Sequence, residues 1–379
     1  MTASTPRPLP AAERLDWLRL TRSENVGPVT FFGLLERFGS AGAALAALPE
    51  LARRGGRSRP IGICAKAAAE REVEEVERIG ARLIALCEAE YPELLAAIYD
   101  PPPVIAVRGH PHLLQRPVVA IVGARNASAS GRRFARAIAG ELGRAELVIA
   151  SGLARGIDGA AHEGALQTGT VAVCAGGVDV AYPPENSGLY DRIVAEGAAL
   201  AEERLGTVPQ ARHFPRRNRM ISGLSLGVLV VEAAPRSGSL ITARLALEQG
   251  REVFAVPGSP LDPRCRGTND LIRRGAMLTE SAADVLEALQ GLLRPPVAER
   301  RRPAFAAGPA PALDDEDVAA ARPEIIEMLG PTPVTVDEII RQCQLSPAIV
   351  STVLLELELA GRLDRHPGNK VSLGASESI

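Results

Sequence analysis

The middle of the chain alternates short apolar runs with amphipathic segments. Six runs rich in Val, Ile, Leu and Ala recur in this region, and helix-like segments lie between most of them. Apolar runs without strict alternation are typical of strands covered on both faces. The alternation of strand and helix therefore predicts an α/β fold with a doubly wound, mostly parallel sheet. The predicted strands are residues 117–122, 146–150, 170–174, 198–202, 226–232 and 252–256, and the predicted helices are residues 131–142, 159–168, 185–196, 218–223 and 239–249.

The regions on either side of this pattern differ from it. Residues 1–88 are dominated by helical periods and predict a helical N-terminal domain. Residues 89–291 hold the predicted sheet domain. Residues 292–320 are rich in Pro and Ala without periodicity, which predicts a flexible linker. Residues 321–379 contain three helix-like segments and a short extended end, and so predict a small third domain.

Composition excludes several classes of protein. Of the 379 residues, 46% are hydrophobic, which is enough for a sizeable core, and the net charge of −2 does not indicate a nucleic-acid or membrane partner. No apolar run of about 18–20 residues predicts a transmembrane helix, and no secretory signal is visible. The five cysteines are widely spaced, which favours reduced thiols in the cytosol over a disulfide framework or a zinc site.

Polar loops follow the predicted strands at the edge where such sheets bind ligands. Gly123, Arg125 and Asn126 lie between the first strand and a helix. A helix N-terminus attracts anions, and an arginine can bind a phosphate through two hydrogen bonds. The spacing is not the G-x-G-x-x-G of dinucleotide sites, and a tight turn would equally explain Gly123.

A second loop of the same kind follows the next strand. Because neighbouring parallel strands end at the same edge, the two loops predict one cationic rim. Asp158 and His162 follow on one helix face. We interpret them as a helix cap and a hydrogen-bonded histidine rather than as an acid–base pair, since no nucleophile or metal site accompanies them. The candidate phosphate ligands of the second loop are Ser151, Gly152, Arg155 and Gly156.

An arginine-rich segment lies between a predicted strand and a short helix. An aromatic ring beside guanidinium groups is typical of single-stranded nucleic-acid sites, where bases stack and arginines follow phosphates. A charge run is usually a solvated face, but residues 212–274 carry eleven arginines and five acidic residues in a chain of net charge −2. The candidate residues of this segment are Phe214, Arg216, Arg217, Asn218 and Arg219.

Two further loops extend the predicted edge. The loop over residues 175–186 either faces a nucleotide or is simply loop architecture. Ser237, Gly238 and Ser239 begin a helix, where small hydroxyl residues serve as caps and also as phosphate ligands.

The order of these motifs resembles that of the DprA/Smf DNA-processing family, whose members are called DNA recombination-mediator protein A. The resemblance covers about residues 91–290. It is carried by the strings at residues 119–125, 151–158, 182–186, 214–219, 237–243, 256–258 and 267–269.

The resemblance implies an extended Rossmann-like fold that binds single-stranded DNA without catalysing a reaction and without a cofactor or metal. It further implies a cytoplasmic homodimer that protects incoming DNA and loads the RecA recombinase during natural transformation. Where the family often has Lys, this chain has Arg155, which keeps the charge. The positions that the resemblance carries over for DNA contact are Arg125, Ser151, Gly152, Arg155, Phe214, Arg217, Asn218 and Arg219. Neutralising about four phosphates with Arg125, Arg155, Arg217 and Arg219 predicts a log–log salt slope near −2.8.

The flanking domains resemble modules that can bind DNA, but their residues favour other roles. Residues 24–30 resemble the turn of a helix-hairpin-helix or SAM-like module, for which we favour a structural or interaction role. Residues 335–372 resemble a winged helix. Its second helix carries Glu356 and Glu358 and no arginine, and residues 313–379 have a net charge of −7. Because phosphate repels an acidic helix, we expect this module to contact protein or to modulate the central domain.

Two alternatives remain open. One is a nucleotide-processing enzyme related to the phosphoribohydrolases, which share a similar core. Their P-G-G-x-G-T-x-x-E motif has only partial counterparts at residues 175–177 and 256–259, both without the glutamate, and no P-loop is present. The other is a protein-interaction scaffold in which the arginines bind acidic partners.

Overall fold

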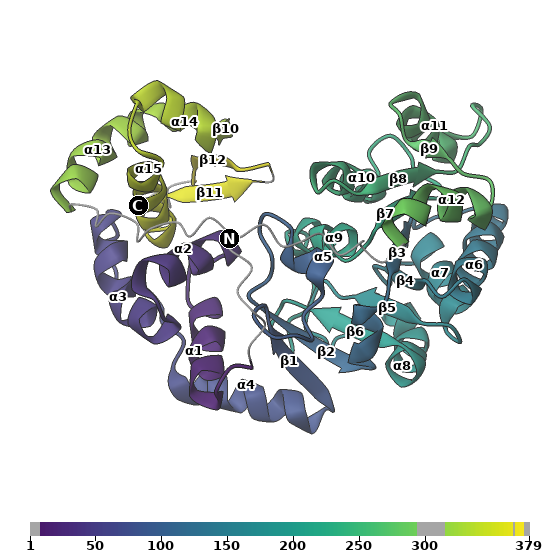
Figure 1. Cartoon of the computed structure of the whole chain (residues 1–379), viewed down its shortest axis with the longest axis horizontal. Helices are drawn as coiled ribbons and strands as arrows, with labels where there is room; N and C mark the ends of the chain where they lie inside the picture. The colour runs from purple at the N-terminus through teal and green to yellow at the C-terminus, as the bar shows by residue number, and fades with distance from the viewer. Residues whose placement is uncertain (1–7, 294–314, 367, 375–379) are drawn as a thin grey trace. The chain divides into compact units, whose positions relative to one another are not determined.

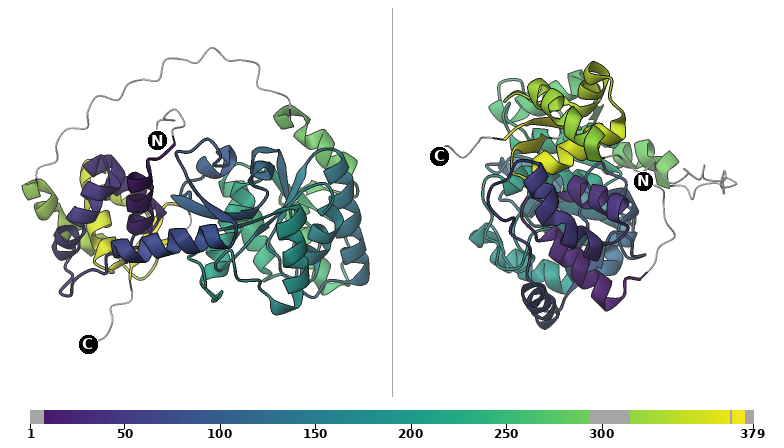
Figure 2. Two further views of the ribbon diagram at one scale, coloured as in Figure 1. Left: turned by 90° about the horizontal axis from the view of Figure 1, so that it is seen from below. Right: turned by 90° about the vertical axis from the view of Figure 1, so that its left-hand side faces the viewer.

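The computed structural model describes residues 8–293, 315–366 and 368–374. These residues divide into two compact units (Figure 1). One unit contains Leu9–Glu70 together with the described residues after 314, and the other contains the described residues from Arg71 to 293. The division falls within α4 (Lys66–Arg78), which is one continuous helix (Figure 2).

The second unit is built on a nine-stranded sheet with the order β1-β2-β6-β5-β4-β3-β7-β8-β9. The strands from β6 to β9 in that order are parallel, whereas β2 is antiparallel to both β1 and β6. The chain moves outward from β3 to β6 and then returns to β7 on the other side of β3, so the strand order reverses between β3 and β7. The strands are β1 (Ala81–Ala85), β2 (Val104–Gly109), β3 (Val118–Val122), β4 (Val148–Ser151), β5 (Thr170–Val173), β6 (Ala198–Ala201), β7 (Gly227–Val230), β8 (Glu252–Ala255) and β9 (Met277–Leu278).

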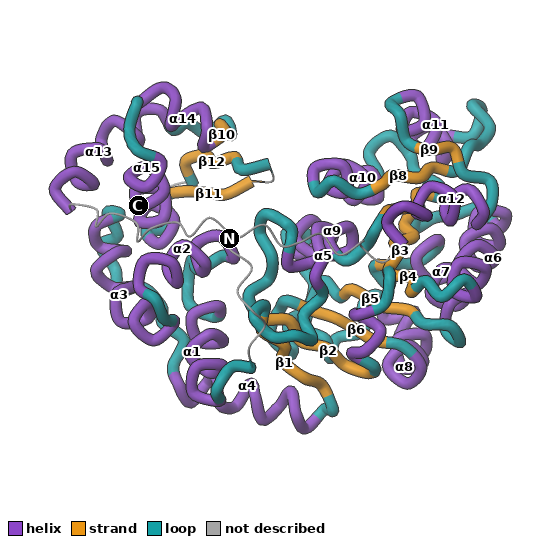
Figure 3. The backbone as a smooth tube through the Cα atoms, in the orientation of Figure 1, coloured by secondary structure: helices purple, strands orange, loops and turns teal. Residues whose placement is uncertain are grey.

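Helices cover both faces of this sheet (Figure 3). On β3, Val119 and Ile121 pack in a core with α6, α7 and α12, whereas Ala120 and Val122 pack in a second core with α9 and α10. Both faces of the strand are thus buried, which explains its continuous apolar run. The helices are α5 (Glu93–Ala96), α6 (Ala129–Arg144), α7 (Ile157–Ala165), α8 (Ser187–Glu196), α9 (His213–Gly223), α10 (Gly238–Glu248), α11 (Arg266–Arg273) and α12 (Ala282–Leu293).

The predicted fold class is confirmed, with corrections at its borders. All six predicted strands are present as β3 to β8. However, β1 lies before residue 89 and pairs with β2 of the central sheet, so the boundary at residue 88 is placed too late. Helix α9 begins at His213 instead of residue 218, which makes the arginine-rich segment the first two turns of a helix and not a loop.

The first unit joins the N-terminal helices to the C-terminal winged helix. Helix α15 packs against α2 and α3, and the Gly55 Cα approaches it so closely that a Cβ there would lie 1.9 Å from the Glu356 carbonyl oxygen. Asn25 donates a hydrogen bond to the Leu359 carbonyl at 3.2 Å. The elements are α1 (Ala11–Thr21), α2 (Pro28–Phe38), α3 (Ala41–Arg54), α13 (Asp315–Met328), β10 (Val334–Thr335), α14 (Val336–Cys343), α15 (Pro347–Leu359), β11 (Leu363–His366) and β12 (Lys370–Leu373).

The predicted linker over residues 292–320 overlaps two helices. Residues 292–293 end α12 and residues 315–320 begin α13, so both ends of the predicted linker were wrong. Residues 294–314 lie outside the described residues.

No single helix in the described part of the chain is long and apolar enough to cross a membrane. The bent pair α2 and α3 meets the length and composition limits only when the two helices are taken together.

Candidate nucleic-acid interface

The two glycine loops that follow β3 and β4 are in direct contact. The Ile157 amide donates to the Ala124 carbonyl at 3.2 Å. Gly156 has φ +81°, and a Cβ at this residue would lie 2.3 Å from that carbonyl oxygen and 2.6 Å from the carbonyl oxygen of Arg125. Only glycine fits this position. The expectation that both loops form one rim is therefore correct, but Gly156 serves the contact between the loops.

A third loop joins the same edge. Asn186 donates from its amide nitrogen to the Leu153 carbonyl at 2.8 Å, which ties the segment after β5 to the loop after β4. Arg155 in that loop is exposed and lies 3.6 Å from the exposed Glu185 carboxylate. Because both side chains are solvated, this ion pair is weak, and Arg155 remains available to a phosphate.

Exposed aromatic and cationic groups meet above these loops. The guanidinium carbon of Arg125 lies 5.2 Å from the centroid of the Phe214 ring, within the range of a cation–π contact. The ring of Tyr182 lies 5.8 Å from the same ring and is tilted by 53°. Tyr182 is 41% exposed, Arg125 is exposed and Phe214 is half-buried. We call Arg125, Tyr182 and Phe214 the aromatic platform.

A buried carboxylate and a buried guanidinium, those of Asp158 and Arg217, lie close to the platform. Asp158 accepts hydrogen bonds from the amides of Gly152 and Ala154 at 3.2 and 3.3 Å. Burial raises the pKa of Asp158, while the nearby Arg217 guanidinium and these amides favour the ionised form. Arg217 donates to the Gly152 carbonyl and, at 2.9 Å, to the Val173 carbonyl. The Gly152 amide, which we expected to bind phosphate, therefore binds an internal carboxylate.

Several predicted DNA ligands are buried. Ser151 is fully buried and donates to the Ile121 carbonyl at 2.6 Å. Arg219 is 7% exposed and contacts both oxygens of Glu202 at 2.7 Å and Asp100 at 3.3 Å. These two side chains are unavailable to DNA in this conformation. The remaining buried residues of the predicted set are Gly152, Arg217, Asn218 and Ser239.

The other predicted residues are accessible. The exposed ones and the half-buried ones lie on loops at the carboxyl edge of the sheet or at the starts of α9 and α10. They are Gly123, Arg125, Asn126, Arg155, Gly156, Phe214, Arg216, Ser237 and Gly238.

The N-terminus of α6 is already occupied by a carboxylate. Ser128 caps the helix by accepting from the Gly131 amide at 2.9 Å. Glu232, which follows β7, accepts from the Ser128 amide at 2.9 Å and from its hydroxyl at 2.5 Å. Glu232 is 6% exposed. This helix start lies at the reversal of strand order, where nucleotide-binding sheets place a phosphate.

The start of α10 is capped by hydroxyl groups instead of a carboxylate. Ser237 accepts from the Ser239 amide at 3.4 Å, and the two hydroxyls lie 2.7 Å apart. Asn218 donates to the Gly238 carbonyl at 3.4 Å, which places this helix start beside α9. The Asn218 side chain therefore links α9 to the start of α10.

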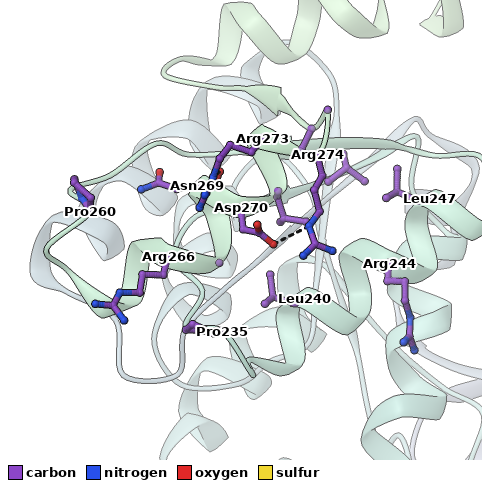
Figure 4. A pocket seen from close by; sticks show the side chains of 15 residues that line it. Pro235, Leu240, Arg244, Leu247, Pro260, Arg266, Asn269, Asp270, Arg273 and Arg274 are labelled. Carbon is purple, nitrogen blue, oxygen red and sulfur yellow. Dashed lines mark hydrogen bonds and ion pairs between the residues drawn. The ribbon is translucent and has the colours of Figure 1, made fainter.

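A separate cavity of about 800 Å³ lies between α10 and α11 (Figure 4). Leu240, Leu247 and Leu271 contribute apolar surface to it, and Arg274 pairs with Asp270 at 2.8 Å at its rim. Part of the positive charge of residues 212–274 therefore lies at this cavity and not at the carboxyl edge of the sheet. The four arginines that line the cavity are Arg244, Arg266, Arg273 and Arg274.

Sequence reasoning missed two residues of the edge. Tyr182 lies in the loop over residues 175–186, to which the sequence assigns no definite role, although an aromatic residue next to Pro at a strand-end loop is a usable signal. Glu232 is the last residue of a predicted strand, but only the structure shows that its carboxylate binds the start of α6.

Together these features define a class: a Rossmann-like protein with an arginine- and aromatic-bearing carboxyl edge, a helical N-terminal domain and a winged helix. Three family models match the chain: DNA recombination-mediator protein A over residues 82–290, the DprA-like N-terminal HHH domain over residues 11–74, and the DprA winged helix domain over residues 307–369. The chain belongs to the DNA recombination-mediator protein A family.

Individual relatives agree with this assignment. Protein Smf of Escherichia coli is 43% identical over 287 residues, which cover 75% of each chain. The X-ray structure of DNA processing protein A from Streptococcus pneumoniae superposes with a TM-score of 0.61 at 36% identity and covers 74% of this chain and 98% of that one. DNA processing protein A from Helicobacter pylori, whose structure is described as giving insight into its single-stranded DNA binding mode, has a TM-score of 0.52 at 29% identity and covers 56% and 96%.

Proposed function

We propose that this protein binds single-stranded DNA at the carboxyl edge of its central sheet and acts in DNA processing during natural transformation and recombination. The observation that carries the proposal is the aromatic platform, in which the Arg125 guanidinium lies against Phe214 beside the exposed Tyr182. Rings stack on unpaired bases of any sequence, and arginines neutralise phosphates. The single-stranded DNA binding described for the Helicobacter pylori relative supports the same assignment.

The exposed groups divide into two roles. Phe214 and Tyr182 contact bases, and Arg125, Arg155 and Arg216 contact phosphates. Because most contacts go to the backbone and to ring faces, sequence preference is weak. Three phosphate contacts on a single strand correspond to a log–log salt slope of about −2.1, below the −2.8 expected for four.

We further propose that the protein is not an enzyme. Glu232 holds the helix start where a nucleotide phosphate would bind. Asp158 and His162, the acid–base candidates, are buried beneath the loops. Loading of the RecA recombinase onto the bound strand is the role that the family membership supports, with the cytosol as the place of action.

A homodimer completes the proposed assembly. Strand β9 forms one edge of the sheet, and its Met277 and Leu278 are 40% and 46% exposed. An open edge with apolar side chains is suited to pairing with a second copy. Light scattering of Leu278→Lys against the unmodified chain tests this assignment, since a charge at the edge should shift a dimer towards the monomer.

The experiment that tests DNA binding is titration of labelled oligothymidine with the full chain across a salt series, with a matched duplex in parallel. We expect tighter binding to the single strand and a slope near −2. Equal affinity for the duplex, or an affinity independent of salt, would reject the proposal. Displacement of the oligonucleotide by an acidic peptide of equal charge would instead favour the scaffold alternative.

A further inference from the structure

Three strand-end loops of the central sheet converge on one buried pair of side chains. Asp158 accepts from two amides of the loop after β4, and the amide of the preceding residue, Ile157, donates to the Ala124 carbonyl in the loop after β3 at 3.2 Å. Arg217 of α9 donates to the carbonyl of Gly152 and to that of Val173 at the end of β5. The pair therefore connects β3, β4 and β5 to the helix that carries Phe214.

We propose that Asp158 and Arg217 are a positioning pair, which holds the aromatic platform in its binding geometry without contacting the DNA. The inference rests on the proposed function, because it names what positions the groups of that site. It reassigns Arg217, which the sequence places among the phosphate ligands.

Burial and hydrogen bonding argue against phosphate contact by Arg217. The residue is only 5% exposed. Its Nη1 atom is directed at two carbonyl oxygens, and a Cβ on Gly152 would lie 2.0 Å from that nitrogen. Its guanidinium carbon lies 5.9 Å from the centroid of the Phe214 ring. A phosphate could bind Nη1 only if these two hydrogen bonds broke.

The same contacts explain how the pair acts on the platform. Phe214 and Arg217 are three residues apart on α9 and so lie on the same helix face. The carbonyls of Gly152, just after β4, and of Val173, in β5, fix the guanidinium, and the guanidinium fixes the first turn of α9 that bears the ring. Asp158 in turn holds the loop after β4 through its two amide hydrogen bonds. Gly156 of that loop packs against the Arg125 backbone.

The principal experiment compares two variants of the full chain in oligothymidine titrations across salt. In Asp158→Asn with Arg217→Met, both charges are removed together, which avoids leaving one buried charge unpaired. Arg125→Ala is the matched control for a phosphate-contacting arginine. We expect the double variant to bind roughly tenfold or more weakly with an unchanged salt slope, and the control to lose about 0.7 of the slope.

Two results would overturn the inference. A slope reduced by about 0.7 in the double variant would show that Arg217 contacts a phosphate. An affinity equal to that of the unmodified chain would show that the pair positions nothing. If the unmodified chain itself does not bind oligothymidine, the proposed function fails, which is a distinct outcome.

A measurement on the unmodified chain covers the case in which the double variant does not fold. Phenylglyoxal modifies accessible arginines, and peptide mass spectrometry locates the product. We expect Arg125 to react in the free protein and to be protected by oligothymidine, and Arg217 to be unreactive in both states. Reaction of Arg217 in the free protein with protection by the oligonucleotide would contradict the inference.

Discussion

The carboxylate of Glu232 accepts hydrogen bonds from both the amide and the hydroxyl of Ser128, at 2.9 and 2.5 Å, where the strand order of the sheet reverses. A helix start at this place ordinarily attracts a ligand phosphate. Here the protein supplies the anion itself, and a second anion would be repelled by it.

We therefore predict that nucleotides are not substrates. Incubation of the full chain with nucleoside mono- and triphosphates should release neither base nor phosphate, as followed by chromatography and a phosphate assay. Glu232→Gln should also be inactive, and it should be less stable by about 1–3 kcal/mol because a charged hydrogen-bond acceptor of the Ser128 amide is lost. Steady turnover by the unmodified chain would instead favour the phosphoribohydrolase-like alternative.

Arg125 should be a phosphate ligand with a measurable salt signature. Its side chain is exposed, and its guanidinium lies over the Phe214 ring. Arg125→Ala should weaken oligothymidine binding at moderate salt and reduce the slope by about 0.7. The matched control is Arg144→Ala, because Arg144 is exposed in the last turn of α6, at the opposite end of the helix from the carboxyl edge. Equal effects of the two substitutions would indicate non-specific charge attraction.

The contrast between Arg125 and Arg219 shows what could be predicted from the sequence and what could not. Six of the parallel strands, β3 to β8, are visible in the sequence because a strand buried on both faces must be apolar throughout. The position of the loops can be predicted as well, since parallel strands all end at one edge of the sheet. In contrast, the sequence places Arg219 among the DNA ligands of an arginine-rich segment, and its burial depends on Glu202 and Asp100, which lie outside that segment.

The same limit applies to the glycines and to the added strands. Gly152 and Gly156 looked like phosphate-binding glycines, but each is required by a close contact within the protein. Strands β1 and β2 were missed because β2 pairs with β6 about a hundred residues later, and periodicity within a segment carries no information about such partners.

Both rings of the aromatic platform should contribute to affinity without contributing to the salt slope. A base stacked on an aromatic side chain is worth about 1–3 kcal/mol. Phe214→Leu and Tyr182→Leu should therefore each weaken oligothymidine binding roughly 5- to 150-fold, with slopes equal to that of the unmodified chain. Phe38, a half-buried ring at the end of α2 in the other unit, provides the control substitution Phe38→Leu. If Tyr182→Leu binds as tightly as this control, only Phe214 stacks on a base.

His162 should make the protein less stable in mild acid. Burial, and to a lesser extent the Arg217 guanidinium, lower its pKa from 6.5 to about 3. Between these values the unfolded chain binds a proton that the folded chain does not, so stability decreases as the pH falls below 6.5. The decrease reaches about 2 kcal/mol at pH 5.

The measurement is urea unfolding at pH 7 and pH 5 for the unmodified chain and for His162→Gln. Gln cannot titrate, but it can still hydrogen-bond to Thr170, the partner of His162 Nδ1 at 2.7 Å. The buried Asp158, whose pKa is raised by burial, has the opposite pH dependence and is common to both proteins. The unmodified chain should therefore lose more stability than the variant over this pH range. Equal losses would show that His162 takes up a proton in the folded state.

The winged helix should contribute to the stability of the N-terminal helices and not to single-strand affinity. Its second helix, α15, was expected to contact protein, and the contacts lie within the chain itself. Glu358 accepts a hydrogen bond from Thr30 of α2 and pairs with Arg365 at 2.6 Å. Glu356 is fully buried and pairs with Arg322 at 2.5 Å. A helix packed in this way is not available to a DNA groove.

Gly55→Val tests this role in the full chain, because its side chain would collide with the backbone of α15. We expect hydrogen exchange to increase in α2, α3 and α15, while the affinity for oligothymidine stays within about twofold. The exposed Gly188 of α8, which has no atom within 4 Å of an added Cβ, provides the control Gly188→Val. Deletion of residues 313–379 should likewise leave single-strand affinity nearly intact. A loss of affinity comparable to that of Arg125→Ala, in either protein, would mean that the winged helix takes part in binding.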